Sequence, residues 1–270
     1  MLKKMAFRPT TFTSHPATLA IIFAIIVNSL AYKTQDYCAK GLCSRDDKKH
    51  IGCNTNRKFA STCDKPKLIP MSTKRKNLLL MIHNRLRNKV AKGKLSNFKP
   101  ASNMSLMIWD DELAYLAELN VMQCEMKHDE CRSTARFKYA GQNLARSWTS
   151  GPLKKHNENI RVGILGWFSE HKDASMKFIR KYGFTSKTIG HFTALVRDVS
   201  SHVGCAMSAY RKTRVVRGKS YNGNEFLLAC NYANTNILKE PIYIEGKPCS
   251  ACPGGARCHR VYTALCDHSD

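Results

Sequence analysis

Twelve cysteines constrain the fold of this chain more than any other feature of its sequence. They lie at positions 38, 43, 53, 63, 124, 131, 205, 230, 249, 252, 258 and 266. An even number of cysteines downstream of a secretory leader is typical of a disulfide framework. We therefore expect six disulfides with no cysteine left over, although the spacing alone leaves their pairing open.

The N-terminus has the three parts of a secretory signal peptide. Basic residues precede an apolar core at Ala17 to Val27, and Ser29-Leu30-Ala31 is a small-x-small cleavage site. The apolar core is shorter than the roughly 20 residues that a transmembrane helix needs. We expect residues 1–31 to be removed and the mature protein to be secreted, extracellular and not transmembrane.

The chain is strongly basic, with 44 Lys and Arg residues, 20 Asp and Glu residues and a formal charge of +24. The leader holds three basic residues and no acidic residue, so the remaining chain has a charge of +21. A charge of this size favours association with anionic partners and says little about the fold. Outside the cell these are acidic proteins, anionic glycans or lipid headgroups. We expect no nucleic acid partner, because no aromatic platform is interleaved with the cations.

Hydrophobic periodicity predicts three helices. The first has an apolar stripe that recurs at every fourth position, formed by Leu78, Ile82, Leu86 and Val90. Gly93 is its expected end. Asp110 is a typical N-cap for the second helix, whose inward-facing residues are Leu113, Leu116 and Ala117. The third contains Ile160, Ile164, Trp167 and Phe168.

Apolar runs predict three strands in the C-terminal third, at residues 192–199, 202–209 and 226–232. The first would begin beside His191, and Arg211 to Lys219 would connect the other two. Five of the nine residues of that connection are cations. They are named the basic patch: Arg211, Lys212, Arg214, Arg217 and Lys219. A solvated surface is the usual meaning of such a run. Helices followed by antiparallel strands indicate an α+β fold.

Several motifs follow one another in a fixed order along the chain. They are His83 to Gly93 (His-Asn-x-x-Arg-Asn-x-Val-Ala-x-Gly), Trp109-Asp110, His128-Asp129-Glu130-Cys131, Gly141-Gln142-Asn143-Leu144, Trp167-Phe168-Ser169-Glu170, Gly190-His191-Phe192-Thr193 and Cys230-Asn231-Tyr232. This ordered set resembles the CAP superfamily of cysteine-rich secretory, antigen 5 and pathogenesis-related 1 proteins. The insect venom allergen 5 branch is the most similar. The resemblance covers roughly residues 37–266.

The resemblance implies a three-layer αβα sandwich with a disulfide-bound N-terminal arm and a short cysteine-rich C-terminal tail. The expected divisions are a signal peptide at 1–31, the arm at 32–70, the CAP domain at 71–240 and the tail at 241–270. The implied disulfides are Cys38–Cys53, Cys43–Cys131, Cys63–Cys124 and Cys205–Cys230. Cys249, Cys252, Cys258 and Cys266 would then pair among themselves. We expect a monomer.

In the CAP family two histidines and two glutamates converge in a central cleft. The matching residues here are His128, Gln142, Glu170 and His191, so that Gln142 removes one anionic ligand or general base. His128, Glu170 and His191 could still bind a divalent metal such as zinc weakly. The same side chains could instead form a purely structural hydrogen-bonded cluster. No cofactor is expected to be required.

Three further residues stand out. Arg197 and Asn234 replace a Trp and a Pro that are usual in the family, and both are expected at the rim of the cleft. Asn103 belongs to Asn103-Met104-Ser105, the N-glycosylation sequon of this chain.

Binding is expected rather than catalysis. The sequence has no Gly-x-Ser-x-Gly elbow, no His-Glu-x-x-His and no phosphate-binding glycine loop. The expected function is a disulfide-braced extracellular interaction module for an anionic partner. Two alternatives stay open, a carrier of a small apolar ligand such as a lipid or sterol, and a metal-assisted hydrolase.

Overall fold

The structure is a computed structural model that describes residues 35–151 and 155–268. The predicted signal peptide lies outside these residues. From Tyr37 onward the chain forms one compact unit. In the part of the chain that is described, none of the helices combines the length and the apolar character needed to span a bilayer.

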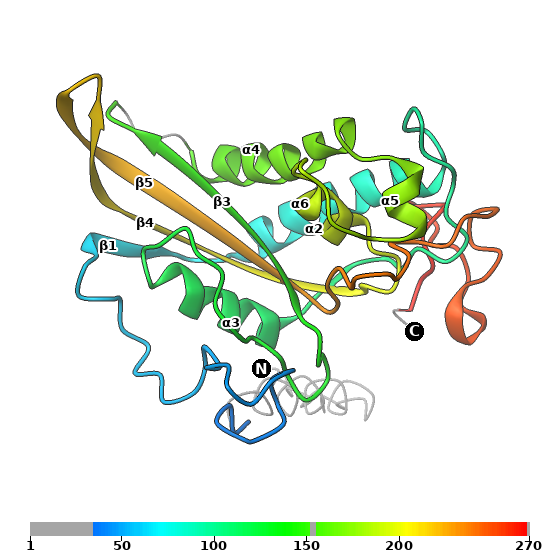
Figure 1. The fold of residues 1–270 in the computed structure, drawn as a ribbon. Coiled ribbons are helices and arrows are strands. Elements are labelled where there is room, and N and C mark those ends of the chain that lie inside the picture. The colour runs from blue at the N-terminus through cyan, green and yellow to red at the C-terminus, as the bar shows by residue number, and fades with distance from the viewer. Residues whose placement is uncertain (1–34, 152–154, 269–270) are drawn as a thin grey trace, which may run out of the picture. The chain divides into compact units, whose positions relative to one another are not determined.

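A five-stranded sheet forms the middle layer of this unit (Figure 1). Its centre is the antiparallel pair β4 (His202–Val216) and β5 (Lys219–Tyr232). β1 (Asp64–Ile69) pairs with β4 on one side, and β3 (Gly141–Thr149) pairs with β5 on the other, both antiparallel. The short β2 (Ile108–Trp109) runs parallel to β4 at its start. The two edge strands β1 and β3 were not predicted from the sequence.

Helix α3 (Asp111–Val121) covers one face of the sheet. As predicted, Asp110 is its N-cap, and the Asp110 carboxylate accepts a hydrogen bond of 2.8 Å from the Leu113 amide. The helix lies unusually close to β4 at Gly204, because a Cβ atom at that position would be 2.1 Å from the Ala114 nitrogen. Only glycine permits this approach.

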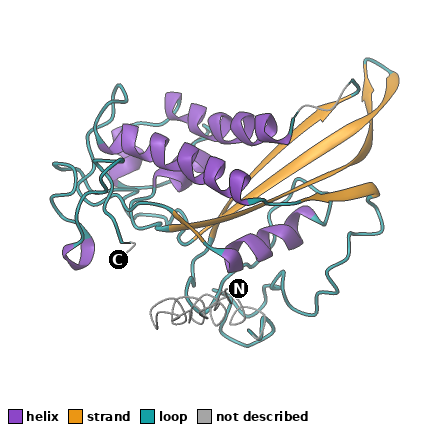
Figure 2. Ribbon diagram, turned by 180° about the vertical axis from the view of Figure 1, so that it is seen from behind, coloured by secondary structure: helices purple, strands orange, loops and turns teal. Residues whose placement is uncertain are grey.

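The opposite face is covered by α2 (Thr73–Ala91), α4 (His156–Ser169) and α6 (Gly190–Val196), with the short α5 (Met176–Arg180) beside them (Figures 1 and 2). Side chains from all three helices and from β4 are fully buried in one apolar cluster, among them Leu79, Ile164, Phe192 and Met207. Gly93, with a φ of 67°, follows the end of α2 as predicted. The helices, the sheet and α3 together form the αβα sandwich that was expected.

The prediction of a strand at residues 192–199 was wrong. Most of this segment is helix α6, and its residues from Phe192 to Val196 are all buried. A short run that is buried on every side shows no periodicity, so its sequence does not distinguish a helix from a strand. His191 therefore lies in the first turn of a helix and not beside a strand.

The two remaining predicted strands are present, and both are longer than expected. Pairing continues from Arg211↔Asn224 to Val216↔Lys219, so most of the predicted connection belongs to the strands. The turn itself is Arg217-Gly218, with φ values of 50° and 74°. Two successive residues with positive φ are typical of a type I′ hairpin turn.

All twelve cysteines form disulfides. The bonds are Cys38–Cys53, Cys43–Cys131, Cys63–Cys124, Cys205–Cys230, Cys249–Cys258 and Cys252–Cys266. The first four are the pairs that the resemblance implies. The second and third join the arm to the segment after α3, and the fourth joins directly opposed residues of β4 and β5. The last two fix the pairing within the tail, which the sequence left open.

Candidate functional site

His191 is held in place by Glu170, the first residue of a 3-10 turn (Glu170–Lys172) that follows α4. One carboxylate oxygen of Glu170 accepts a hydrogen bond of 2.5 Å from His191 Nδ1. The other accepts bonds of 2.9 Å and 3.1 Å from the backbone amides of His191 and Phe192. Glu170 thus satisfies two amides of the first turn of α6, which would otherwise lack partners. The imidazole keeps only its Nε2 atom available for a ligand.

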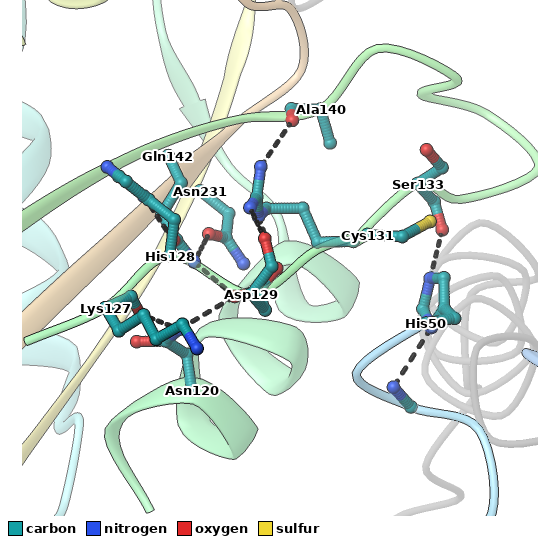
Figure 3. A network of polar contacts seen from close by, with 12 residues as sticks. His50, Asn120, Lys127, His128, Asp129, Cys131, Ser133, Ala140, Gln142 and Asn231 are labelled. Atoms are coloured by element: carbon teal, nitrogen blue, oxygen red, sulfur yellow. Dashed lines mark hydrogen bonds and ion pairs between the residues drawn. The ribbon is translucent and has the colours of Figure 1, made fainter. Parts of the chain in front are cut away.

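His128 is held in the same way by Gln142 (Figure 3). The Gln142 amide nitrogen donates to Asp129 Oδ1 at 2.7 Å and to Asn231 Oδ1 at 3.0 Å. Because the Asp129 carboxylate only accepts, these bonds fix the orientation of the amide, and Gln142 Oε1 accepts from His128 Nδ1 at 2.7 Å. Asn120 Nδ2 also donates to Asp129 Oδ1, at 2.8 Å. His128 therefore also keeps only Nε2 available.

Both histidines line one pocket of about 240 Å³. Gln142, Asn143 and Asn236 form part of its wall. Burial lowers the pKa of His128, and the hydrogen bond with Gln142 only partly opposes this shift. The neutral imidazole is consequently favoured at His128. The structure thus brings the four residues predicted from the sequence to one place, as two hydrogen-bonded pairs.

A second, mostly apolar pocket of about 360 Å³ begins at Glu170 and His191. It runs between α4 and the edge strand β3, and its walls include Gly166, Trp167 and Leu228. The Trp167 indole stacks on the His191 ring, with 6.4 Å between ring centroids. We name this pocket the α4–β3 groove.

The fit of the cleft to a metal is incomplete. Structural and catalytic zinc sites use three or four protein ligands, whereas this cleft offers the Nε2 atoms of His128 and His191. The Glu170 carboxylate already accepts three hydrogen bonds, and Gln142 is bonded at both of its polar atoms. Two imidazoles can bind a divalent cation together with water, and the cation would act there as a Lewis acid.

In the described residues, the one group of three potential metal ligands that lie close together is elsewhere. The ligand atoms of Cys249, Cys252 and Cys266 lie within 4.8 Å of one another. All three cysteines belong to disulfides. A disulfide sulfur is not a thiolate, so this cluster in the tail is a pair of crosslinks and not a metal site.

A chain of buried hydrogen bonds, which we name the Tyr232 relay, supports the backbone of His191. The sequence did not assign these residues to the site. Tyr232 Oη lies 3.0 Å from His83 Nε2 and accepts a hydrogen bond of 3.3 Å from Asn143 Nδ2. Asn143 Nδ2 also donates to the carbonyl of His191 at 3.0 Å. His83 is fully buried. Asn143 and Tyr232 belong to the ordered motifs, as does His83, and their places in those motifs were the signal that could have found them.

Arg197 does not form the rim of the cleft. It is buried, donates from Nη1 to the Pro241 carbonyl at 2.5 Å and forms an ion pair with Glu240. The expectation for this residue was wrong, because α6 ends here and directs the side chain toward the segment that leads into the tail. Asn103 is half-buried, between the buried residues Ser102 and Met104.

The comparison with known families agrees with this geometry. The profile described as "CAP: Cysteine-rich secretory protein family" matches residues 80–232. This chain belongs to the CAP superfamily. The match contains both histidine pairs of the cleft and the whole of β4 and β5.

Individual relatives place this CAP protein in the antigen 5-like branch. "Antigen 5 like allergen Cul n 1" of Culicoides nubeculosus is 50% identical over 200 residues, which cover 70% of this chain and 89% of that protein. "Venom allergen-1" of Aedes aegypti is 37% identical over 256 residues, which cover 94% of each chain. Both relatives are insect proteins, as the resemblance predicted.

Solved structures share the fold. The protein of "Crystal structure of NaASP2 with Zn2+" has a TM-score of 0.57 and 25% identity, and the match covers 72% of this chain and 96% of that one. Na-ASP-1 has a TM-score of 0.58 and 22% identity, and the match covers 77% of this chain and 50% of that one. Zinc is named with the first of these two relatives.

Gln142→Glu should destabilise this CAP protein by about 2 kcal/mol at pH 7. The new carboxylate would face the Asp129 carboxylate, and both hydrogen bonds donated by the Gln142 amide would be lost. Adding Asp129→Asn should recover about half of the loss, since the new amide can donate again. Chemical unfolding of the four members of this cycle measures the coupling. Equal stability of wild type and Gln142→Glu would contradict the hydrogen-bond roles assigned to Gln142.

Acid should destabilise the fold through His83. Burial lowers the pKa of His83 to about 4, so below pH 6.5 the unfolded chain binds a proton that the folded chain does not. The contribution to stability is present above pH 6.5 and falls by roughly 3 kcal/mol as the pH approaches 4. Denaturant unfolding at several pH values measures this effect. The free energy of unfolding should depend less steeply on pH in His83→Gln than in wild type. The prediction is wrong if His83→Gln is folded at pH 8 and its free energy of unfolding depends on pH as steeply as that of wild type.

Proposed function

We propose that this CAP protein is a secreted, disulfide-braced module that binds an anionic extracellular partner through its basic patch. The observation that supports this most is the exposure of the patch, in which most cations form no ion pair in the described structure. Arg214 forms an ion pair with Glu225, while the other four cations form no ion pair with any residue in the described ranges. No acidic residue lies between Arg211 and Asn224.

The physical consequence is an attractive field for polyanions. Cations that lack partners in the folded protein keep their full charge for a ligand, and the net charge of the chain adds a long-range attraction. Both terms are screened by salt over about 10 Å at 0.1 M ionic strength. Six disulfides and the antigen 5-like relatives support an extracellular setting for such binding.

Binding rather than turnover is supported by the chemistry of the cleft. The residues described as lining the pocket of about 240 Å³ include no serine and no cysteine. The carboxylate nearest to His191 is occupied by the amides of α6. We infer that the two histidine pairs chiefly brace the junction of β3 and α6, that metal binding there is weak, and that no cofactor is required. N-glycosylation at Asn103 and a monomeric state remain part of the proposal.

Neutralising the basic patch should weaken binding to a sulfated glycan such as heparin at least about tenfold at 0.15 M salt. The variant is Arg211→Gln, Lys212→Gln, Arg217→Gln and Lys219→Gln together. The matched control removes four exposed cations elsewhere, through Lys94→Gln, Lys239→Gln, Lys247→Gln and Arg260→Gln. Salt elution from immobilised heparin provides the measurement. Equal losses in both variants would show that net charge, and not the patch, governs binding.

The α4–β3 groove favours a second function, the carriage of a small apolar ligand. Its volume of about 360 Å³ lies in the range of small-molecule pockets, and its walls are mostly apolar. Gly166 lines the groove, and a Cβ atom there would meet no other atom within 4 Å. A larger side chain at this position can therefore occupy the groove without disturbing the helix.

Native mass spectrometry of the secreted protein tests this second function. Wild type and Gly166→Ala should carry an adduct of several hundred daltons, and Gly166→Leu should lose it. The glycan of Asn103 is removed first with a glycosidase. The carrier function is ruled out if the wild-type protein has no adduct and takes up no added fatty acid.

A further inference from the structure

All of the basic patch except Arg211 lies where β4 and β5 have no other described strand beside them. Pairing of β1 with β4 ends at Asp64↔Arg211, and pairing of β3 with β5 ends at Thr149↔Asn224. The pairs from Lys212↔Gly223 to Val216↔Lys219 therefore form a two-stranded ribbon, which projects from the sheet (Figures 1 and 2). Every residue from Val215 to Asn222 is exposed.

The two faces of this ribbon differ in chemistry. Directly opposed residues of paired strands point to the same face, and the faces alternate along each strand. Lys212, Arg214, Val216, Lys219 and Tyr221 share one face. Thr213, Val215, Ser220 and Asn222 share the other, where the Thr213 hydroxyl donates to Asn222 Oδ1 at 2.7 Å. The first face combines cations with an aromatic and an aliphatic side chain, and the second is mainly neutral and polar.

Contacts on the first face confirm this assignment. The Arg214 guanidinium lies 5.5 Å from the centre of the Trp148 ring and pairs with Glu225. The Trp148 indole donates to the Lys212 carbonyl at 2.9 Å. Gly223 makes room for it, because a Cβ atom there would be 2.6 Å from the Trp148 ring. Trp148 and Arg214 thus brace the base of the face, and Val216, Lys219 and Tyr221 form its outer part.

The outer part combines exposed apolar side chains with a cation that has no ion pair among the residues described. Val216 is 48% exposed and Tyr221 is 42% exposed, and they are diagonal neighbours across the two strands. Lys219 stands directly opposite Val216 and has no ion pair in the described structure. A glycan bound by cations alone would leave both apolar side chains without a role. A bilayer surface takes both kinds of group, because apolar side chains enter the headgroup boundary while Lys and Arg extend to the phosphates.

We propose that the ribbon face bearing Val216, Lys219 and Tyr221 docks on a membrane surface that contains anionic lipids. This inference rests on the proposed function, since it names the anionic partner of the basic patch. Tyr221 lies at the depth where tyrosine is enriched in membrane interfaces, and Lys212 and Lys219 contact lipid phosphates. The opposite face, with Val215, stays in water.

Vesicle sedimentation of the full secreted chain tests the proposal at 0.15 M salt. The probe is phosphatidylcholine vesicles with about 30% phosphatidylserine, against vesicles of phosphatidylcholine alone. The test variant is Val216→Thr with Tyr221→Ser, and the matched variant on the other face is Val215→Thr with Asn222→Ser. Valine to threonine keeps the β-branched shape that strands favour. We expect the test variant to bind anionic vesicles about tenfold more weakly and the matched variant to bind like wild type.

Immobilised heparin separates this inference from the function on which it rests. Both double variants should elute from heparin at the salt concentration of wild type, because neither changes a charge. A wild-type protein that binds heparin but no anionic vesicle would overturn the membrane proposal and leave the proposed function standing. Binding to neither would overturn both. Equal losses of vesicle binding in the two double variants would overturn the assignment of the docking face.

Discussion

One buried cation, the guanidinium of Arg87, joins the parts of this protein on which the cleft depends. Arg87 is fully buried on α2. It donates to the carbonyls of Ser105, Leu195, Arg197 and Asp198, at distances from 2.7 to 3.3 Å. Burial lowers its pKa to about 10, and the nearby Asp198 charge opposes that shift. A buried charge is tolerated when its donors are satisfied, and here backbone carbonyls satisfy them.

The consequence of this arrangement is a short helix fixed at both ends. Two of the carbonyls that Arg87 binds lie at the C-terminal end of α6, where a helix lacks internal partners. Glu170 binds two amides at the N-terminal end of the same helix. An isolated helix of seven residues is not stable in water. The orientation of His191 therefore depends on one cation and one anion from other elements.

The two ends of the β4–β5 hairpin, at the cleft and at the ribbon, differ in how many neighbouring residues hold them. The cleft is braced by two histidine pairs, by the Tyr232 relay and by the Cys205–Cys230 disulfide, all near the start of β4 and the end of β5. The ribbon lies at the other end of the same two strands, with no neighbouring strand and few buried side chains. Local stability follows the number of buried contacts. The same hairpin thus has a well-buried end at the cleft and an exposed end at the ribbon.

The sequence by itself determined the features that depend on local chemistry. An even set of cysteines indicated complete pairing, Asp110 and Gly93 marked helix ends through their own backbone preferences, and the ordered motifs identified the four cleft residues. Only the tertiary structure decided that residues 190–196 are a helix, that β1 and β3 complete the sheet, and that Asp129 and Asn231 accept the hydrogen bonds of the Gln142 amide. It also separated the two faces of the ribbon. These outcomes depend on hydrogen bonds and burial between residues far apart in the chain, and periodicity within a short segment does not record them.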